Sequence, residues 1–394
     1  MSAGSSETAA ATRLASLDSI RGLAALSVVI CHYLIFLQGT ALGREIWHWL
    51  WVPPLSLFRS AYGSVILFFV LSGYVLALSL AGERRSWLVF AIRRFFRIWP
   101  AFAIALGASF VIGEIVPVPE PVAALFDRLG ATRLPESLWS LLSQLAMTTS
   151  DVSLDMPGWS LVHELRISLL FPLLLYGVRR APLTTLSGSL CLEVAAQDGP
   201  SWLTTLIPHT AVYIVYFSIG ACVAIYRRQI GEWMPAKPAL RVLSFVAALV
   251  LISIPKDRPE AGVLAGLGAS YIIAFVTTSP RMTTTLSRCW FEFLGRVSYS
   301  LYLTHVVILL ALLRLFGSYL PAGAILAMAV PIIGLAAVSG YYLVEKPSIK
   351  FGRTVARFVS SQRRIWPAAP DISNESKLAI SPDMNVFDSP QFMP

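Results

Sequence analysis

Long apolar segments recur along the whole of this 394-residue chain. Hydrophobic residues make up 56% of the sequence and charged residues 13%, against about 25% charged residues in soluble domains. A helix of about 20 apolar residues crosses the hydrocarbon layer of a bilayer and satisfies its own backbone hydrogen bonds. The sequence therefore predicts an all-α polytopic integral membrane protein and argues against a soluble domain.

We expect about ten transmembrane helices. The apolar segments lie at about 17–37, 60–80, 95–116, 160–177, 183–196, 204–226, 239–254, 261–278, 297–316 and 322–343. The weakest segment, 183–196, decides the topology, because the arginine-rich connections share one side only if it crosses the membrane. Since such connections stay in the cytoplasm, the pattern favours ten crossings, both termini cytoplasmic, in the cell inner (cytoplasmic) membrane.

The polar ends divide the chain into three parts. Residues 1–15 are predicted to be a disordered N-terminal tail, 16–346 the transmembrane domain, and 347–394 a cytoplasmic, disordered C-terminal tail. The formal net charge of +9 is explained by cytoplasmic arginines, so no nucleic acid is predicted as a partner. The four cysteines lack the spacing of metal ligands, and no metal is predicted.

The first apolar segment carries one arginine, Arg21, near its start and one histidine, His32, eleven residues further on. On an α-helix that separation is about three turns, or about 16 Å of rise, which puts both side chains on one face. An ionisable group at such depth is costly and marks a candidate functional site. A snorkelling arginine and a histidine packed between helices are the structural alternative.

A basic cluster, Arg93-Arg94-Phe-Phe-Arg97-Ile-Trp-Pro, lies at the start of the third apolar segment. Arg94 and Arg97 are three residues apart and share a helix face. The cluster is either a positive belt at the membrane surface, with Trp99 as its anchor, or a cradle for a phosphate-bearing ligand. The second interpretation rests on guanidinium groups, which bind phosphate bidentately.

Two further polar clusters enter apolar segments. The first, within 157–164, contains Trp159, Ser160, His163 and Glu164. Its carboxylate either caps the helix N-terminus, where the dipole stabilises it, or orients a histidine or binds a sugar hydroxyl. The second, within 293–305, contains Ser298, Tyr299 and His305. Its hydroxyls either join helices or take part in chemistry.

Together, and in this order, the clusters resemble the membrane acyltransferase-3 family, the polytopic O-acyltransferases that modify O-antigen, peptidoglycan, exopolysaccharides, Nod factors and some macrolides. The resemblance covers about residues 15–347. Its motifs are the arginine–ten residues–histidine pair Arg21 and His32, FFVLSGYVL at 68–76, RxxR at Arg94 and Arg97, WSL-x-x-E at 159–164, LG-x-x-SYSLYL-x-H at 294–305, and Glu345 with Pro347. One departure follows Glu164, where many members carry a second acid and this chain has Leu165, Arg166, Ile167 and Ser168.

The resemblance implies transfer of an acyl group, most commonly acetyl, from cytoplasmic acyl-CoA to a hydroxyl of a glycan or glycolipid. No tightly bound cofactor is expected, since acyl-CoA is a substrate. The polyanionic donor is expected to bind Arg21, Arg93, Arg94 and Arg97. His32 is the expected general base, because a neutral imidazole suits that role, and we favour this over a covalent acyl-histidine.

The other site residues take supporting roles under this hypothesis. Glu164 or His305 would orient His32 or contact the sugar. Ser298, Tyr299 or Ser72 would donate hydrogen bonds to the oxyanion. The residues on the acceptor side would be Trp159, Ser160 and His163. The bilayer and the acceptor are the expected partners.

Two other functions fit the same composition. A multi-pass transporter or exporter of a lipid-linked saccharide or small anion would use Arg21 and His32 as pathway residues. It predicts inverted repeats with matched broken helices, and the sequence contains no such pair. A structural partner in an envelope assembly would leave the buried histidine and arginine unexplained.

Overall fold

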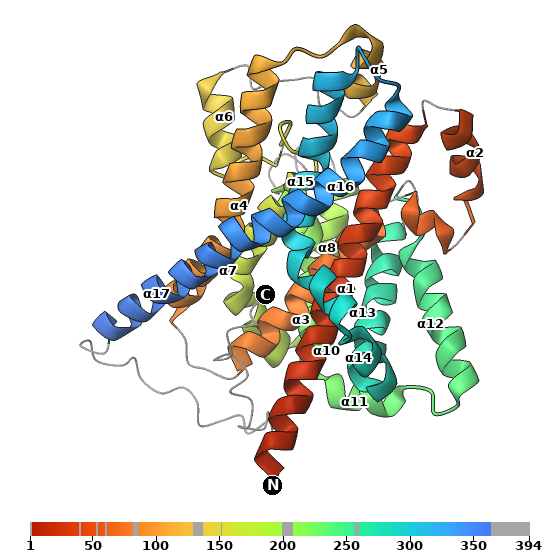
Figure 1. The fold of residues 1–394 in the computed structure, drawn as a ribbon. Coiled ribbons are helices and arrows are strands. Elements are labelled where there is room, and N and C mark those ends of the chain that lie inside the picture. Colours follow the sequence, from red (N-terminus) through yellow and green to blue (C-terminus); the bar gives the residue numbers. More distant parts are fainter. Residues whose placement is uncertain are drawn as a thin grey trace.

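The computed structural model describes residues 2–38, 41–52, 54–59, 61–81, 86–128, 137–150, 152–198, 208–256 and 260–363. Every regular element within these ranges is helical (Figure 1). In chain order the elements are α1 (Ser2–Leu37), α2 (Ala41–Trp49), η1 (Leu55–Phe58), α3 (Tyr62–Ala81), α4 (Trp87–Ile115), α5 (Glu120–Arg128), α6 (Leu138–Leu145), α7 (Gly158–Arg180), α8 (Pro182–Asp198), η2 (His209–Tyr213), α10 (Ile214–Ile225), α11 (Arg227–Trp233), α12 (Pro238–Ile252), α13 (Ala261–Thr278), α14 (Pro280–Leu286), α15 (Cys289–Phe316), α16 (Ala322–Gly340), η3 (Tyr341–Glu345) and α17 (Lys346–Arg363).

The prediction of an all-helical, polytopic membrane protein is confirmed. Within the described ranges, seven helices are long and apolar enough to cross a membrane, or eight if α10 and α11, which meet at 79°, form one broken span. A helix is present at each of the ten predicted segments. However, α8 and α12 have only 17 and 15 residues. Ten crossings and cytoplasmic termini therefore stay predictions.

Both predicted tails differ from the structure. Helix α1 begins at Ser2, within the stretch expected to be disordered, and α17 continues as far as Arg363. The N-terminal stretch is rich in alanine, the best helix former, and it extends a helix that is already nucleated. The ring of Phe351 in α17 packs against the ring of Phe96 in α4, with centroids 5.1 Å apart. Residues 364–394 lie outside the described part of the chain.

Close backbone approaches hold the centre of the bundle together. A Cβ placed on Gly22 of α1 would lie 2.7 Å from the backbone nitrogen of Gly295 in α15. A Cβ on Gly73 of α3 would lie 2.2 Å from the carbonyl oxygen of Phe217 in α10. Small residues at such crossings let helix backbones pack closely within a membrane. Figure 1 shows α1 crossing the bundle beside α15, with α5 and α6 at the end opposite the N-terminus.

We predict that Gly22→Leu destabilises the protein, because its side chain would meet backbone that cannot move aside. Overpacking of this kind costs about 1–3 kcal/mol or more. Thermal unfolding of the purified protein in detergent measures the effect. Gly107→Leu in α4 is the matched control, since a Cβ there has no atom within 4 Å. Equal melting temperatures for the two variants would show that the α1–α15 contact is not a tight crossing.

Candidate active site

A small cavity of about 40 Å³ lies where α1, α3, α4, α7 and α15 converge. Its lining combines charged, hydroxyl and aromatic side chains. These are Arg21, Phe68, Phe69, Ser72, Arg94, Arg97, Ile98, Ser160, Leu161, Glu164, Ser298, Tyr299 and Tyr302. Most of the residues predicted from the sequence therefore meet in one place. The lining does not include Arg93, His32, His305, Trp159 or His163.

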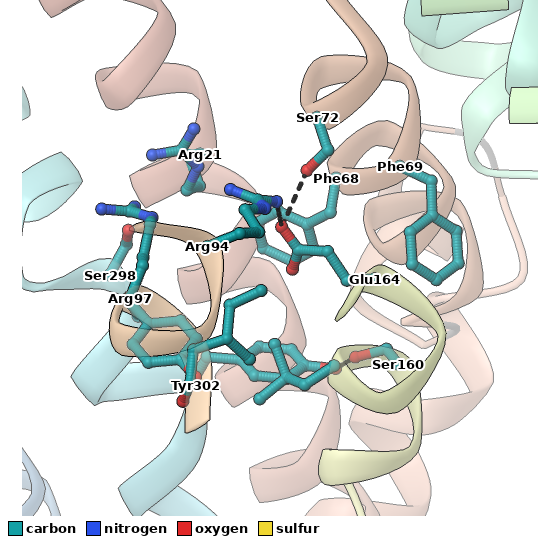
Figure 2. Close-up of a pocket in the computed structure, with 13 residues that line it drawn as sticks. Arg21, Phe68, Phe69, Ser72, Arg94, Arg97, Ser160, Glu164, Ser298 and Tyr302 are labelled. Carbon is teal, nitrogen blue, oxygen red and sulfur yellow. Dashed lines mark hydrogen bonds and ion pairs between the residues drawn. The ribbon is translucent and has the colours of Figure 1, made fainter. Parts of the chain in front are cut away.

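An ion pair between Arg94 and Glu164 lies at the centre of the cavity wall (Figure 2). The Arg94 Nη2 donates to Glu164 Oε1 at 2.5 Å, and its Nε donates to Ser168 Oγ at 3.0 Å. Ser72 donates to the same Glu164 oxygen at 3.0 Å. The structure therefore places Glu164 against an arginine, where the sequence left open an orienting contact with a histidine. Ser168, one of the residues that depart from the family motif, completes the contacts of Arg94.

Three arginines from two helices line the same cavity. Arg21, Arg94 and Arg97 lie together on one side of it (Figure 2). Arg21 pairs with Asp18 one turn earlier, at 2.8 Å. With the charge of Arg94 balanced by Glu164, this wall suits an anionic ligand, because guanidinium groups form charge-assisted hydrogen bonds with phosphate.

Glu345 is a buried acid near these arginines that the predicted site omitted. Its side chain is 3% exposed and its Oε2 accepts a hydrogen bond from Ser300 at 3.0 Å. It ends a single π-helical turn, Tyr341–Glu345, between α16 and α17, and such turns are frequent at functional sites. The glutamate-x-proline motif contains this residue. The sequence alone could not show that its carboxyl group is buried against Ser300 of α15.

The two predicted histidines form a buried pair beside the cavity. His32 Nδ1 lies 2.8 Å from His305 Nε2, and His305 Nδ1 lies 3.1 Å from the carbonyl oxygen of Leu301. A carbonyl oxygen only accepts hydrogen bonds, so His305 Nδ1 carries a proton. In the neutral ring, the other nitrogen, Nε2, then carries a lone pair and accepts. The proton between the rings therefore belongs to His32 Nδ1. This assignment leaves a lone pair on His32 Nε2.

Tyr302 connects the cavity lining to the histidine pair, and Phe68 packs against it. Phe68 and Tyr302 both line the cavity, and their rings meet edge to face at 5.6 Å. The ring of Tyr302 lies 6.0 Å from that of His305. Its hydroxyl is 2.8 Å from Ser160 Oγ and donates to the carbonyl oxygen of Pro157 at 3.1 Å. The charged wall and the imidazoles thus occupy neighbouring compartments.

The predicted oxyanion donors already make hydrogen bonds within the protein. Ser298 donates to the carbonyl oxygen of Gly295 at 2.7 Å, and Tyr299 to that of Ile98 at 2.6 Å. Ser72 donates to Glu164. Because a hydroxyl has a single proton to donate, each would have to exchange its present acceptor to bind an oxyanion.

Trp159 and His163 belong to a separate cluster on α7. His163 Nδ1 lies 2.9 Å from Thr210 Oγ1, and its ring packs at 4.8 Å from that of Tyr213. Arg166 donates to Thr210 and to the carbonyl oxygen of Met147, a residue with φ of 55°. The structure therefore divides the predicted acceptor side: Ser160 lines the cavity, while Trp159 and His163 form part of this aromatic cluster.

Asp155, in the segment that leads into α7, is another acid that the predicted site omitted. It is fully buried, and neither carboxyl oxygen has a hydrogen-bond partner among the described residues. Burial raises the pKa of this carboxyl well above its usual range. The protonated form is therefore the one that the folded protein favours.

Comparison with known proteins agrees with this set of motifs. The acyltransferase domain family Acyl_transf_3 matches residues 14–342. The chain belongs to this family. It is also 24% identical over 394 residues to acyltransferase MdmB of Streptomyces mycarofaciens, covering 91% of this chain and 95% of that protein. No solved structure matches. The chain is therefore a membrane acyltransferase.

We predict that Arg94→Met and Glu164→Gln each destabilise the protein, because either change leaves a charge without its partner. Breaking a buried pair costs about 3–5 kcal/mol, and the 19% exposure of the Glu164 side chain lowers this cost. The double variant should recover part of the loss. A double-mutant cycle of unfolding in detergent measures the coupling, with Arg93→Met as a control outside the cavity. Strictly additive losses would refute the coupling.

For Asp155, we predict that Asp155→Asn stabilises the protein at high pH. The folded pKa is raised, so the native state binds more protons than the unfolded state. The contribution of Asp155 to stability is therefore full below the unfolded pKa of about 3.9 and is lost as pH rises through the folded pKa. Melting temperatures of both proteins across this range test it. A difference in melting temperature between the two proteins that stays constant with pH would contradict the raised pKa of Asp155.

Proposed function

We propose that this protein transfers an acyl group, most commonly acetyl, from acyl-CoA to a hydroxyl of a glycan or glycolipid, with His32 as general base. The observation that carries the proposal is the hydrogen-bonded series from the Leu301 carbonyl through His305 to His32. Family membership supports the acyl transfer itself. The donor, the acceptor and the base are the proposed parts.

The donor is assigned to the arginine wall. Coenzyme A carries several phosphate charges, and Arg21, Arg94 and Arg97 line one cavity. Bidentate guanidinium contacts would hold these phosphates. Arg93, which does not line the cavity, would contribute only long-range attraction. We assign the side from which coenzyme A would reach these arginines to the cytoplasm, since acyl-CoA is made there and arginine-rich ends stay inside.

The proposed chemical step is a direct displacement. His32 Nε2 takes the proton of the acceptor hydroxyl as the oxygen attacks the thioester carbonyl. A tetrahedral intermediate forms, its C–S bond breaks, and the coenzyme A thiolate leaves and takes up the proton that His32 returns. The acceptor then carries the acyl group as an ester. No external oxidant or reductant is needed.

His305 acts as a positioning residue in this scheme. Its Nε2 accepts from His32 Nδ1, so it fixes both the ring orientation and the tautomer of the base. The same contact stabilises the imidazolium that forms on His32 during the step. This is the task that a carboxylate performs in hydrolase triads, here performed by a neutral ring.

Other roles follow from the positions of the side chains. The acyl group would pass Phe68 and Tyr302 to reach the imidazoles, so these rings limit its path. Ser298 and Tyr299 would stabilise the oxyanion after exchanging their carbonyl acceptors. The acceptor would approach His32 from the opposite membrane face, past the cluster of Trp159 and His163. Ser160, which lines the same cavity as the arginines, would lie where donor and acceptor meet. Glu164 supports the donor site through Arg94.

The test is acyl transfer from labelled acetyl-CoA in membranes that contain the wild-type chain or its variants. We predict that His32→Ala lowers kcat by about 10²–10⁴-fold, the usual contribution of a general base. His305→Ala should lower kcat by less and leave the KM for acetyl-CoA unchanged. His48→Ala, at an exposed position on α2, is the control. Wild-type turnover by a folded His32→Ala protein would overturn the proposal.

A further inference from the structure

A second cavity, of about 430 Å³, lies between α10, α11, α12 and α13, remote from the arginine wall. Its lining is mostly apolar and includes Val223, Ala248, Leu251, Leu267 and Ala274. The polar groups Ser244 and Tyr271 hydrogen-bond to each other. The cavity therefore presents hydrocarbon surface with its main polar atoms already satisfied.

This cavity opens at the outside of the bundle. Its rim residue Leu267 is 52% exposed. The adjoining outward face of α12 carries Val242 and Leu243, which are 62% and 64% exposed. In Figure 1, α12 lies at the edge of the bundle next to α13. Because α13 is long and apolar enough to cross a membrane, and exposed aliphatic faces of such helices contact lipid, the mouth of the cavity lies against the hydrocarbon layer.

A hydrocarbon chain is the occupant that gives this cavity the lowest free energy. Apolar cavities stay dry, so water does not fill such a space. Leaving it empty would also be destabilising, since the free-energy cost grows with the volume of the void. A lipid chain entering from the bilayer satisfies both conditions without moving the protein.

Positive charge lies at one end of the cavity. Helix α11 turns away from α10 by 79° and lies across the end of α13, with Gly231 facing Thr278. Ile230, on α11, lines the cavity, and Arg227 precedes it by one turn. Arg241 precedes the lining residue Ser244 by one turn, and its Nε donates to the carbonyl oxygen of Pro235 at 2.7 Å. Both arginines are half-buried.

We propose that this cavity binds one acyl chain of an anionic membrane phospholipid, with the phosphate held near Arg227 and Arg241. The chain runs from α11 toward Leu251 and Leu267, between α12 and α13. The exposed Trp233 at the end of α11, 81% accessible, fits an anchor at the same membrane surface. This site is separate from the acyl-transfer site and does not depend on the proposed function.

Photo-crosslinking tests the proposal. The full chain is placed in nanodiscs with phosphatidylglycerol that carries a diazirine at the end of one acyl chain, or with the matched phosphatidylcholine probe. Peptide mass spectrometry should find the label concentrated on α12 and α13, more strongly with phosphatidylglycerol. Arg227→Gln and Arg241→Gln should each lower phosphatidylglycerol capture relative to phosphatidylcholine by up to about fivefold, the effect of one basic residue near an anionic surface.

A cavity-filling variant and two control variants distinguish the cavity from the general lipid surface. Ala274→Phe fills the cavity and should lose most of the label on these helices. Val246→Phe, on the outward face of α12, and the exposed Arg228→Gln should keep it. If Ala274→Phe does not fold, Ala247→Phe at the rim serves the same purpose. Label spread evenly around the bundle, undiminished label in the filled variants, or equal capture of the two lipids would overturn the proposal.

Discussion

The ion pair between Arg94 and Glu164 is the interaction on which the rest of the site depends. It joins α4 to α7, and Ser72 adds α3 through the same carboxylate oxygen. Removing either partner would leave a charge where water does not compensate it, so the three helices are held in one arrangement. These helices form three sides of the cavity, and α4 places Arg97 on the same wall as Arg94.

Helix α1 links this charged wall to the proposed base. It carries Arg21 into the cavity and His32 into contact with His305, whose ring lies beside Tyr302. The glycine crossing with α15 fixes its height relative to the helix that carries His305. In the proposed mechanism, one helix therefore contributes both to the binding of the anionic donor and to the abstraction of the proton from the acceptor.

The sequence predicts where helices form better than it predicts which side chains contact one another. Apolar runs and basic flanks located a helix at each of the ten expected segments, because these features act locally. The partner of Glu164 was not predictable, since a motif gives its position on α7 and not which helix faces it. His32 and His305 are 273 positions apart, and their contact and tautomers follow only from packing. Helix α17 was not predicted, because its composition is mostly polar and its few apolar residues, which lie on one face, were not recognised as an amphipathic pattern.

The central claim is that the protein makes an ester at the expense of a thioester. The most direct measurement follows acetyl-CoA with a labelled acetyl group in membranes that contain the chain and its acceptor. The account predicts that free coenzyme A thiol appears, and label enters envelope glycan, in equal amounts, as mass spectrometry of the glycan would show. Intact acetyl-CoA beside folded protein, or unlabelled glycan despite thiol release, would contradict it.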